Sequence, residues 1–140
     1  MTDNSNVIKN ETASGQDSLP SILLIEDDII NANVIQRFLK KEFKVDFAFT
    51  GAKGIELAKT NEYILVLLDI NLGRGITGLE VLNQIKQLEK FTNIPIIAST
   101  AYTMKGDREK LLEAGFDDYI SKPYTMDEIL VKIKEHIKIS

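Results

Sequence analysis

Polar side chains that could take part in chemistry directly follow four short apolar segments of the chain. They are carboxylates, hydroxyls and one ammonium group, in order Glu26, Asp27, Asp28, Asp69, Ser99, Thr100, Ser121 and Lys122. Two unit charges about 4 Å apart repel by about 4 kcal/mol at an effective dielectric constant of about 20. A fold that gathers several carboxylates therefore normally needs a cation among them, and carboxylate, carbonyl and water oxygens are the ligands that Mg²⁺ prefers. A metal ion beside a carboxylate and a lysine predicts a phosphoryl-transfer site.

Each of these residues, taken alone, also has a purely structural explanation. An aspartate such as Asp28, placed directly after a strand, is often a turn residue or the N-cap of a helix. Thr100 could cap the helix that follows it, and Lys122 could be a solvated loop lysine. It is the combination of residues, rather than any one of them, that indicates a functional site.

The segments that must position these side chains alternate between strands and helices. Continuous or alternating apolar residues predict strands at 22–25, 43–49, 64–68, 94–98 and 116–120. Apolar residues at helical spacing fill the intervals between these strands. Five strand–helix pairs predict the α/β class, with a doubly wound, five-stranded parallel sheet covered by helices on both faces.

Three of the predicted helices have features of their own. The buried stripe expected for the first helix consists of Ile30, Val34 and Phe38, widened by Ile35 and Leu39. Thr125 and Glu128 have the spacing of a capping box and predict the start of the last helix. The fourth helix, at about 105–113, is rich in charge and poor in apolar residues, which is typical of a loosely held element.

The carboxyl edge of the sheet is where a ligand is expected. In an open parallel sheet, ligands bind beyond the carboxyl ends of the strands. Four of the five predicted strands deliver a carboxylate, a hydroxyl or an ammonium group to that edge, whereas 43–49 is followed by Thr50 and Gly51, which suit a helix cap. The candidate residues are therefore predicted to meet at one edge of the sheet.

Composition narrows the class of protein. The chain has 140 residues, 17 of them basic and 21 acidic, and a net charge of −4, which argues against direct binding to nucleic acid. It has no cysteine, so disulfides and thiolate sites are excluded. No apolar run approaches the ~18 residues of a membrane span, and the N-terminus lacks the pattern of a secretory signal. We expect a cytoplasmic protein without membrane contact, with a disordered tail at 1–18 and one domain at 19–140.

The motifs at the predicted strand ends resemble those of a known family, the CheY-like receiver domains of two-component response regulators. They are Leu24-Ile-Glu-Asp-Asp28, Leu68-Asp-Ile-Asn71, Ser99-Thr-Ala101 and Tyr119-Ile-Ser-Lys-Pro123, and the resemblance covers about residues 20–138. It implies a flavodoxin-like fold with strand order 2-1-3-4-5 and Mg²⁺ as cofactor. It also implies that a histidine kinase or a histidine phosphotransfer protein is the partner that supplies a phosphoryl group. The chain would be either a stand-alone regulator or a receiver from a hybrid kinase or larger regulator.

The resemblance assigns the metal site residue by residue. Asp27 matches the acid that coordinates Mg²⁺ directly, and Glu26 matches the acid that reaches the metal through water. Asp69 matches the phospho-accepting aspartate, which is also a metal ligand, and Asn71 lies where the family lends a backbone carbonyl to the metal. Asp28 falls one place past the acidic pair and is left outside the site.

The resemblance also assigns the phosphoryl contacts and the switch. Thr100 matches the hydroxyl that contacts the phosphoryl group, and Lys122 matches the lysine that pairs with its oxygens. Tyr119 matches the aromatic residue that changes rotamer on activation. Phosphorylation is then expected to alter the face formed by the fourth helix, the fifth strand and the fifth helix. Slow autodephosphorylation would be the only turnover, and the Lys122–Pro123 peptide is expected to be cis.

The loop after Asp69 departs from the family pattern. Many members carry a proline four residues after the acceptor and a glycine eight residues after it. Here the fourth residue is Gly73, and the glycine before the next helix is Gly78, nine residues after Asp69. The loop is thus one residue longer, and we expect Arg74, which lies between two glycines, to stay outside the phosphoryl site.

Three other functions were weighed against the receiver. The segment 73–78 fits the dinucleotide fingerprint G-x-G-x-x-G, but the next predicted strand ends without the required acid, and Asp69 would repel a pyrophosphate. A haloacid-dehalogenase-like phosphatase needs an acid two residues after its nucleophile, where this chain has Asn71. A degenerate receiver that only binds protein is opposed by the intact Asp27, Asp69, Thr100 and Lys122. His136, the only histidine, is expected to be a surface residue and not a phosphoryl relay.

Overall fold

A computed structural model of the chain describes residues 18–73, 75–101 and 106–137. Its elements, in chain order, are β1 (Ser21–Ile25), α2 (Ile29–Leu39), β2 (Lys44–Ala48), α3 (Gly51–Thr60), β3 (Leu65–Asp69), α4 (Gly78–Lys86), η1 (Glu89–Phe91), β4 (Ile96–Thr100), α5 (Asp107–Ala114), β5 (Asp118–Ser121) and α6 (Met126–His136). Residues 1–17 of the predicted tail lie outside the described residues. None of the helices in the described ranges has the length and apolar character that crossing a bilayer requires.

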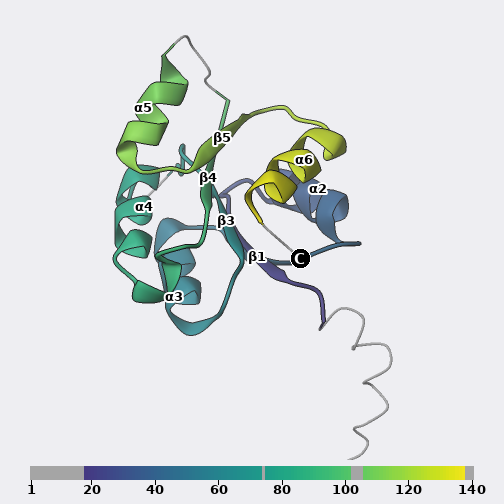
Figure 1. Ribbon diagram of the computed structural model, residues 1–140, viewed down its shortest axis with the longest axis horizontal. Coiled ribbons are helices and arrows are strands. Elements are labelled where there is room, and N and C mark those ends of the chain that lie inside the picture. Colours follow the sequence, from purple (N-terminus) through teal and green to yellow (C-terminus); the bar gives the residue numbers. More distant parts are fainter. Residues whose placement is uncertain (1–17, 74, 102–105, 138–140) are drawn as a thin grey trace, which may run out of the picture.

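The strands form one parallel sheet in the order β2-β1-β3-β4-β5. Helices α2 and α6 lie on one face, and α3, α4 and α5 lie on the other (Figure 1). Each face has its own apolar core: Ile35 and Ile133 belong to the first, and Ile55 and Leu82 to the second. The predicted doubly wound sheet and its strand order are confirmed.

Strands β3, β4 and β5 end later in the chain than the apolar runs predicted. Asp69 is the last residue of β3 and Thr100 is the last residue of β4, so both belong to strands and not to the following loops. Asp69 pairs with Ser99 across β3 and β4, and the Ile70 N–H still donates to the Ser99 carbonyl (3.0 Å). The backbone ladder therefore extends past the last apolar side chain and holds the polar residues rigidly at the sheet edge.

Helix α2 buries a different face from the one predicted. Ile30 and Val34 are 76% and 38% exposed, whereas Ala32, Ile35 and Leu39 are buried. The stripe predicted through Ile30 and Val34 was wrong, although Ile35 and Leu39 do face the core. This helix carries apolar residues on more than one face, so periodicity alone does not determine which face packs on the sheet.

The remaining helices follow their local signals. Thr125 and Glu128 form the predicted capping box of α6, with the Glu128 N–H donating to Thr125 Oγ1 (3.1 Å). Thr77 and Glu80 form a second capping box at the start of α4. Helix α5 buries none of its residues, as its charged composition suggested.

Candidate active site at the carboxyl edge of the sheet

Buried polar side chains cluster where β1, β3 and β4 end. Glu26 directly follows β1 and is 2% exposed, and Asp69 and Thr100 are 4% and 3% exposed. Glu26 lies directly beyond β1, whereas Asp69 and Thr100 are the last residues of β3 and β4, and the residues that precede them in these strands are largely buried. Burying carboxylates in this way requires compensating partners.

Lys122 supplies one such partner. Its Nζ lies 2.9 Å from Glu26 Oε1 and 3.0 Å from Asp69 Oδ2, so a single ammonium group bridges the two buried carboxylates. The lysine directly follows β5, and its backbone N–H donates to the Thr100 carbonyl (2.8 Å). The Lys122–Pro123 peptide is cis, as predicted.

Backbone amides hold the carboxylates in place as well. Asp69 Oδ1 accepts the Asn71 N–H (2.9 Å), and Glu26 Oε2 accepts the Asp28 N–H (3.2 Å). The Asp28 side chain caps α2 by accepting the Ile30 N–H (2.9 Å), which is the structural role first considered for it. The Asp28 carboxylate is thus engaged in capping α2, and its exclusion from the site stays a prediction.

The charges of the site are not balanced by Lys122 alone. Burial raises the pKa of Glu26 to about 7, the hydrogen bond with Asp69 adds to this increase, and Lys122 offsets part of it. Burial by itself would lower the pKa of Lys122, but its hydrogen bonds to Glu26 and Asp69 outweigh burial, so its pKa lies above the ordinary value. The site therefore favours the binding of a further cation.

The donors present fit a hard divalent metal. Glu26, Asp27 and Asp69 each offer a carboxylate oxygen, and these oxygens lie within 4.8 Å of one another. Three carboxylates beside one ammonium group leave excess negative charge, and oxygen ligands of this kind suit Mg²⁺. The Asn71 N–H is engaged by Asp69, and the use of the Asn71 carbonyl as a ligand stays a prediction.

Thr100 and Tyr119 lie in different surroundings. Thr100 and Asn71 border a cavity of about 220 Å³ that also reaches Asp107 and Lys110 of α5. Tyr119 is half-buried and lines a separate groove of about 510 Å³ between α5 and α6. Thr100 thus lies at the carboxyl edge of the sheet beside Asn71, whereas Tyr119 lies on the face formed by α5, β5 and α6.

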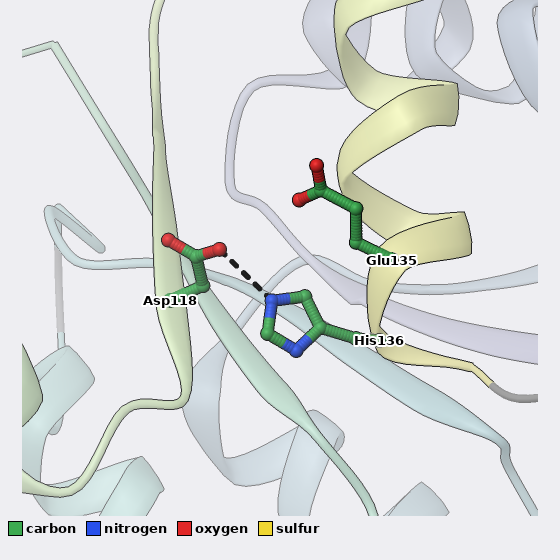
Figure 2. Close-up of side chains that lie close together, drawn as sticks. All are labelled: Asp118, Glu135 and His136. Carbon is green, nitrogen blue, oxygen red and sulfur yellow. Dashed lines mark hydrogen bonds and ion pairs between the residues drawn. The ribbon is translucent and has the colours of Figure 1, made fainter.

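His136, which we expected to be a surface residue, has an acidic partner that the sequence did not reveal. Figure 2 shows it beside Asp118 and Glu135; its Nε2 lies 2.8 Å from Asp118 Oδ2, and its side chain is 24% exposed. Lys132 Nζ lies 3.1 Å from the same oxygen. Burial would raise the pKa of Asp118, but its hydrogen bonds to His136, the Tyr119 N–H and Lys132 hold it below the ordinary value. The sequence did not reveal this contact because His136 and Asp118 are 18 residues apart and meet only when α6 packs beside β5.

The lengthened loop contributes a contact that the sequence did not reveal. The Gly73 N–H donates to Asp27 Oδ2 at 2.9 Å. The only feature of the sequence that could have indicated this contact is the departure from the family pattern at position 73. Arg74, predicted to stay outside the site, lies outside the described residues. The same contact opposes dinucleotide binding, because the first amide of the apparent fingerprint is already engaged by a carboxylate.

Comparison with known proteins identifies the family. A family model described as the response regulator receiver domain matches residues 22–134. The chain belongs to the receiver domains of response regulators. This receiver is 31% identical to the polar-differentiation response regulator DivK of Brucella ovis, over 84% of this chain and 95% of that protein. It is 41% identical to the transcriptional regulatory protein DltR of Streptococcus agalactiae, over 81% of this chain but 50% of that protein.

A solved structure agrees with this assignment. The receiver resembles the receiver domain of the sensor histidine kinase PA1611 from Pseudomonas aeruginosa, with a TM-score of 0.77 and 31% identity. The match covers 85% of this chain and 98% of that one. The PA1611 structure is described with a magnesium ion coordinated in its active site cleft.

Proposed function

We propose that this receiver is a phosphorylation switch that takes a phosphoryl group from a phosphohistidine onto Asp69. The observation that carries the proposal is the bridge from Lys122 Nζ to Asp69 Oδ2 and Glu26 Oε1 at the carboxyl edge of the sheet. A buried aspartate beside a lysine and two further carboxylates suits phosphoryl transfer, in which positioning and charge neutralisation provide most of the catalysis.

In the proposed reaction, a carboxylate oxygen of Asp69 attacks phosphorus in line. The new O–P bond forms as the P–N bond to the histidine ring breaks, and the imidazole leaves with the electron pair and takes up a proton. Lys122 neutralises charge on the transferred oxygens, and the Thr100 hydroxyl contacts one of them. Mg²⁺, when held by Glu26, Asp27, Asp69 and the Asn71 carbonyl, supplies the remaining positive charge.

The phosphorylated receiver would then signal through the face formed by α5, β5 and α6. An acyl phosphate adds about −1.5 to −2 of charge at Asp69. Thr100, the last residue of β4, directly follows Ser99, which pairs with Asp69, and Tyr119 lies on the neighbouring strand β5 at the groove of about 510 Å³. Helix α5 buries no residue, which makes it the element that moves at least cost.

The proposed partner is a histidine kinase or a histidine phosphotransfer protein in the cytoplasm. A second candidate function is a degenerate receiver that only binds protein, but the complete set of Glu26, Asp69 and Lys122 contacts favours the phosphorylated switch.

Phosphorylation by small donors tests the proposal directly. Wild type and Asp69→Asn are incubated with Mg²⁺ and either acetyl phosphate or phosphoramidate, which carries a P–N bond, and their intact masses are measured. We expect wild type to gain one phosphoryl group from each donor and Asp69→Asn to gain none. Equal gain in the two proteins would refute Asp69 as the acceptor, and no gain in wild type would favour the binding module.

A further inference from the structure

Asp27 is the least restrained carboxylate of the proposed metal site. Glu26 and Asp69 are buried and hydrogen-bonded to Lys122, whereas Asp27 is exposed. Among the described residues, the hydrogen bond found for the Asp27 carboxylate is the one from the Gly73 N–H, at 2.9 Å from Oδ2. An exposed side chain with one restraint loses its orientation when that restraint is removed.

Gly73 also leaves the space that this oxygen occupies. A Cβ at position 73 would lie 2.9 Å from Asp27 Oδ2, closer than non-bonded atoms are normally found. That oxygen is the free end of an exposed side chain, so a larger residue at position 73 displaces the carboxylate and leaves the backbone in place. The Gly73 N–H thus holds Asp27 Oδ2 in place, and the lack of a side chain at position 73 leaves room for that oxygen.

This position matters because the Asp27 carboxylate belongs to the cluster whose oxygens lie within 4.8 Å of one another. Hydrogen-bond donors to a metal-ligating carboxylate orient it, and their loss commonly weakens metal binding by about 10–100-fold. We propose that Gly73 is a positioning residue for Mg²⁺, which holds Asp27 in its coordinating orientation from the lengthened β3–α4 loop. The inference rests on the proposed Mg²⁺ site. A receiver with proline at this place has no N–H to donate and cannot form the same contact.

Two substitutions remove the two parts of this contact separately. Gly73→Ala keeps the N–H but places a methyl group against Asp27 Oδ2, and Gly73→Pro removes the N–H. Gly75→Ala is the matched control, because Gly75 has φ +81° and a Cβ there meets nothing within 4 Å. It therefore strains the same loop without touching Asp27.

Mg²⁺ dissociation constants are measured by isothermal titration calorimetry, and melting temperatures in EDTA report on folding. We expect both Gly73 variants to bind Mg²⁺ about 10–100-fold more weakly than wild type. Gly73→Ala should melt at nearly the wild-type temperature. Gly75→Ala should keep the wild-type Mg²⁺ affinity even if it melts at a lower temperature.

A double-mutant cycle separates positioning from general disturbance of the loop. If Gly73 acts through Asp27, Gly73→Ala should cause no further loss of Mg²⁺ affinity in an Asp27→Ala background. Wild-type affinity in both Gly73 variants, or an undiminished effect of Gly73→Ala without Asp27, would overturn the inference. Absence of Mg²⁺ binding by wild type would instead refute the proposed metal site, and this inference with it.

Discussion

Lys122 and Glu26 lie 96 positions apart in the sequence, yet Lys122 Nζ is 2.9 Å from Glu26 Oε1. The same ammonium group contacts Asp69 Oδ2 at 3.0 Å, so the lysine divides its charge between two buried carboxylates. Without metal, the site therefore keeps electrostatic repulsion that is expected to oppose folding. The first three predictions test this balance.

Replacing Asp69 by asparagine should stabilise the metal-free protein. The substitution removes one negative charge from the cluster, and Lys122 keeps its contact with Glu26. In EDTA at neutral pH, Asp69→Asn should melt a few degrees above wild type, since about 1 kcal/mol shifts the melting temperature of such a domain by about 4 °C. Saturating Mg²⁺ should narrow the difference, because wild type has the fuller ligand set. A lower melting temperature for Asp69→Asn in EDTA would contradict the proposed crowding.

The stability of the metal-free protein should also depend on pH through Glu26. The pKa of Glu26 rises from 4.5 in its ordinary state to about 7 in the folded protein, so the folded state binds this proton more tightly. The resulting stabilisation is complete below pH 4.5 and is lost as the pH rises through about 7. As the pH rises, the free energy of unfolding in EDTA should fall less in Glu26→Gln than in wild type, by about 2 kcal/mol, as measured by urea unfolding. The same pH profile in both proteins would show that Glu26 titrates normally.

Removing Lys122 should destabilise the fold much more than removing an exposed ion-paired lysine. Lys122→Met leaves two buried carboxylates facing each other, with an expected loss of about 2–3 kcal/mol at neutral pH in EDTA. Lys134→Met is the matched control, because Lys134 pairs with Glu42 at 2.7 Å between two half-exposed side chains. Exposed pairs of that kind contribute about 0–1 kcal/mol. Equal losses in urea unfolding would mean that Lys122 does not stabilise the cluster.

The contacts of Asp118 with His136 (Figure 2) and with Lys132 should stabilise the protein without affecting phosphorylation. Hydrogen bonds from His136 and Lys132 hold the pKa of Asp118 below 3.8, so its contribution is present above that pH and is lost as the pH falls through the folded value. Asp118→Asn should therefore lower the free energy of unfolding by about 1–3 kcal/mol at neutral pH, and the loss should shrink in acid.

Acetyl phosphate labelling provides the second measurement for this variant. Asp118 opens β5, whereas Lys122 follows its end, so labelling of Asp118→Asn should match that of wild type. Asp127→Asn, which changes an exposed acid in the first turn of α6, should leave stability nearly unchanged. Reduced labelling of Asp118→Asn alone would show that the two ends of β5 are coupled.

Much of this protein was predictable from local sequence. The runs 22–25 and 65–68 are buried in the parallel sheet, and Asp69 and Lys122 lie at its carboxyl edge. The reason is that continuous apolar segments in an alternating strand–helix order have few ways to bury themselves, and parallel strands bring their carboxyl ends to one edge. The capping box at Thr125 is equally local, because its partner lies three residues away.

Tertiary structure alone decided the features that depend on distant partners. Helix α2 has apolar residues on several faces, and its packing on the sheet buries Ala32 and Ile35 but leaves Ile30 exposed. The contact between Gly73 and Asp27 joins residues 46 positions apart, and it forms only because the loop after β3 brings the Gly73 N–H to the Asp27 carboxylate. Periodicity reports which backbone element forms, whereas the rotation of a helix and the reach of a loop amide are set only when the elements pack together.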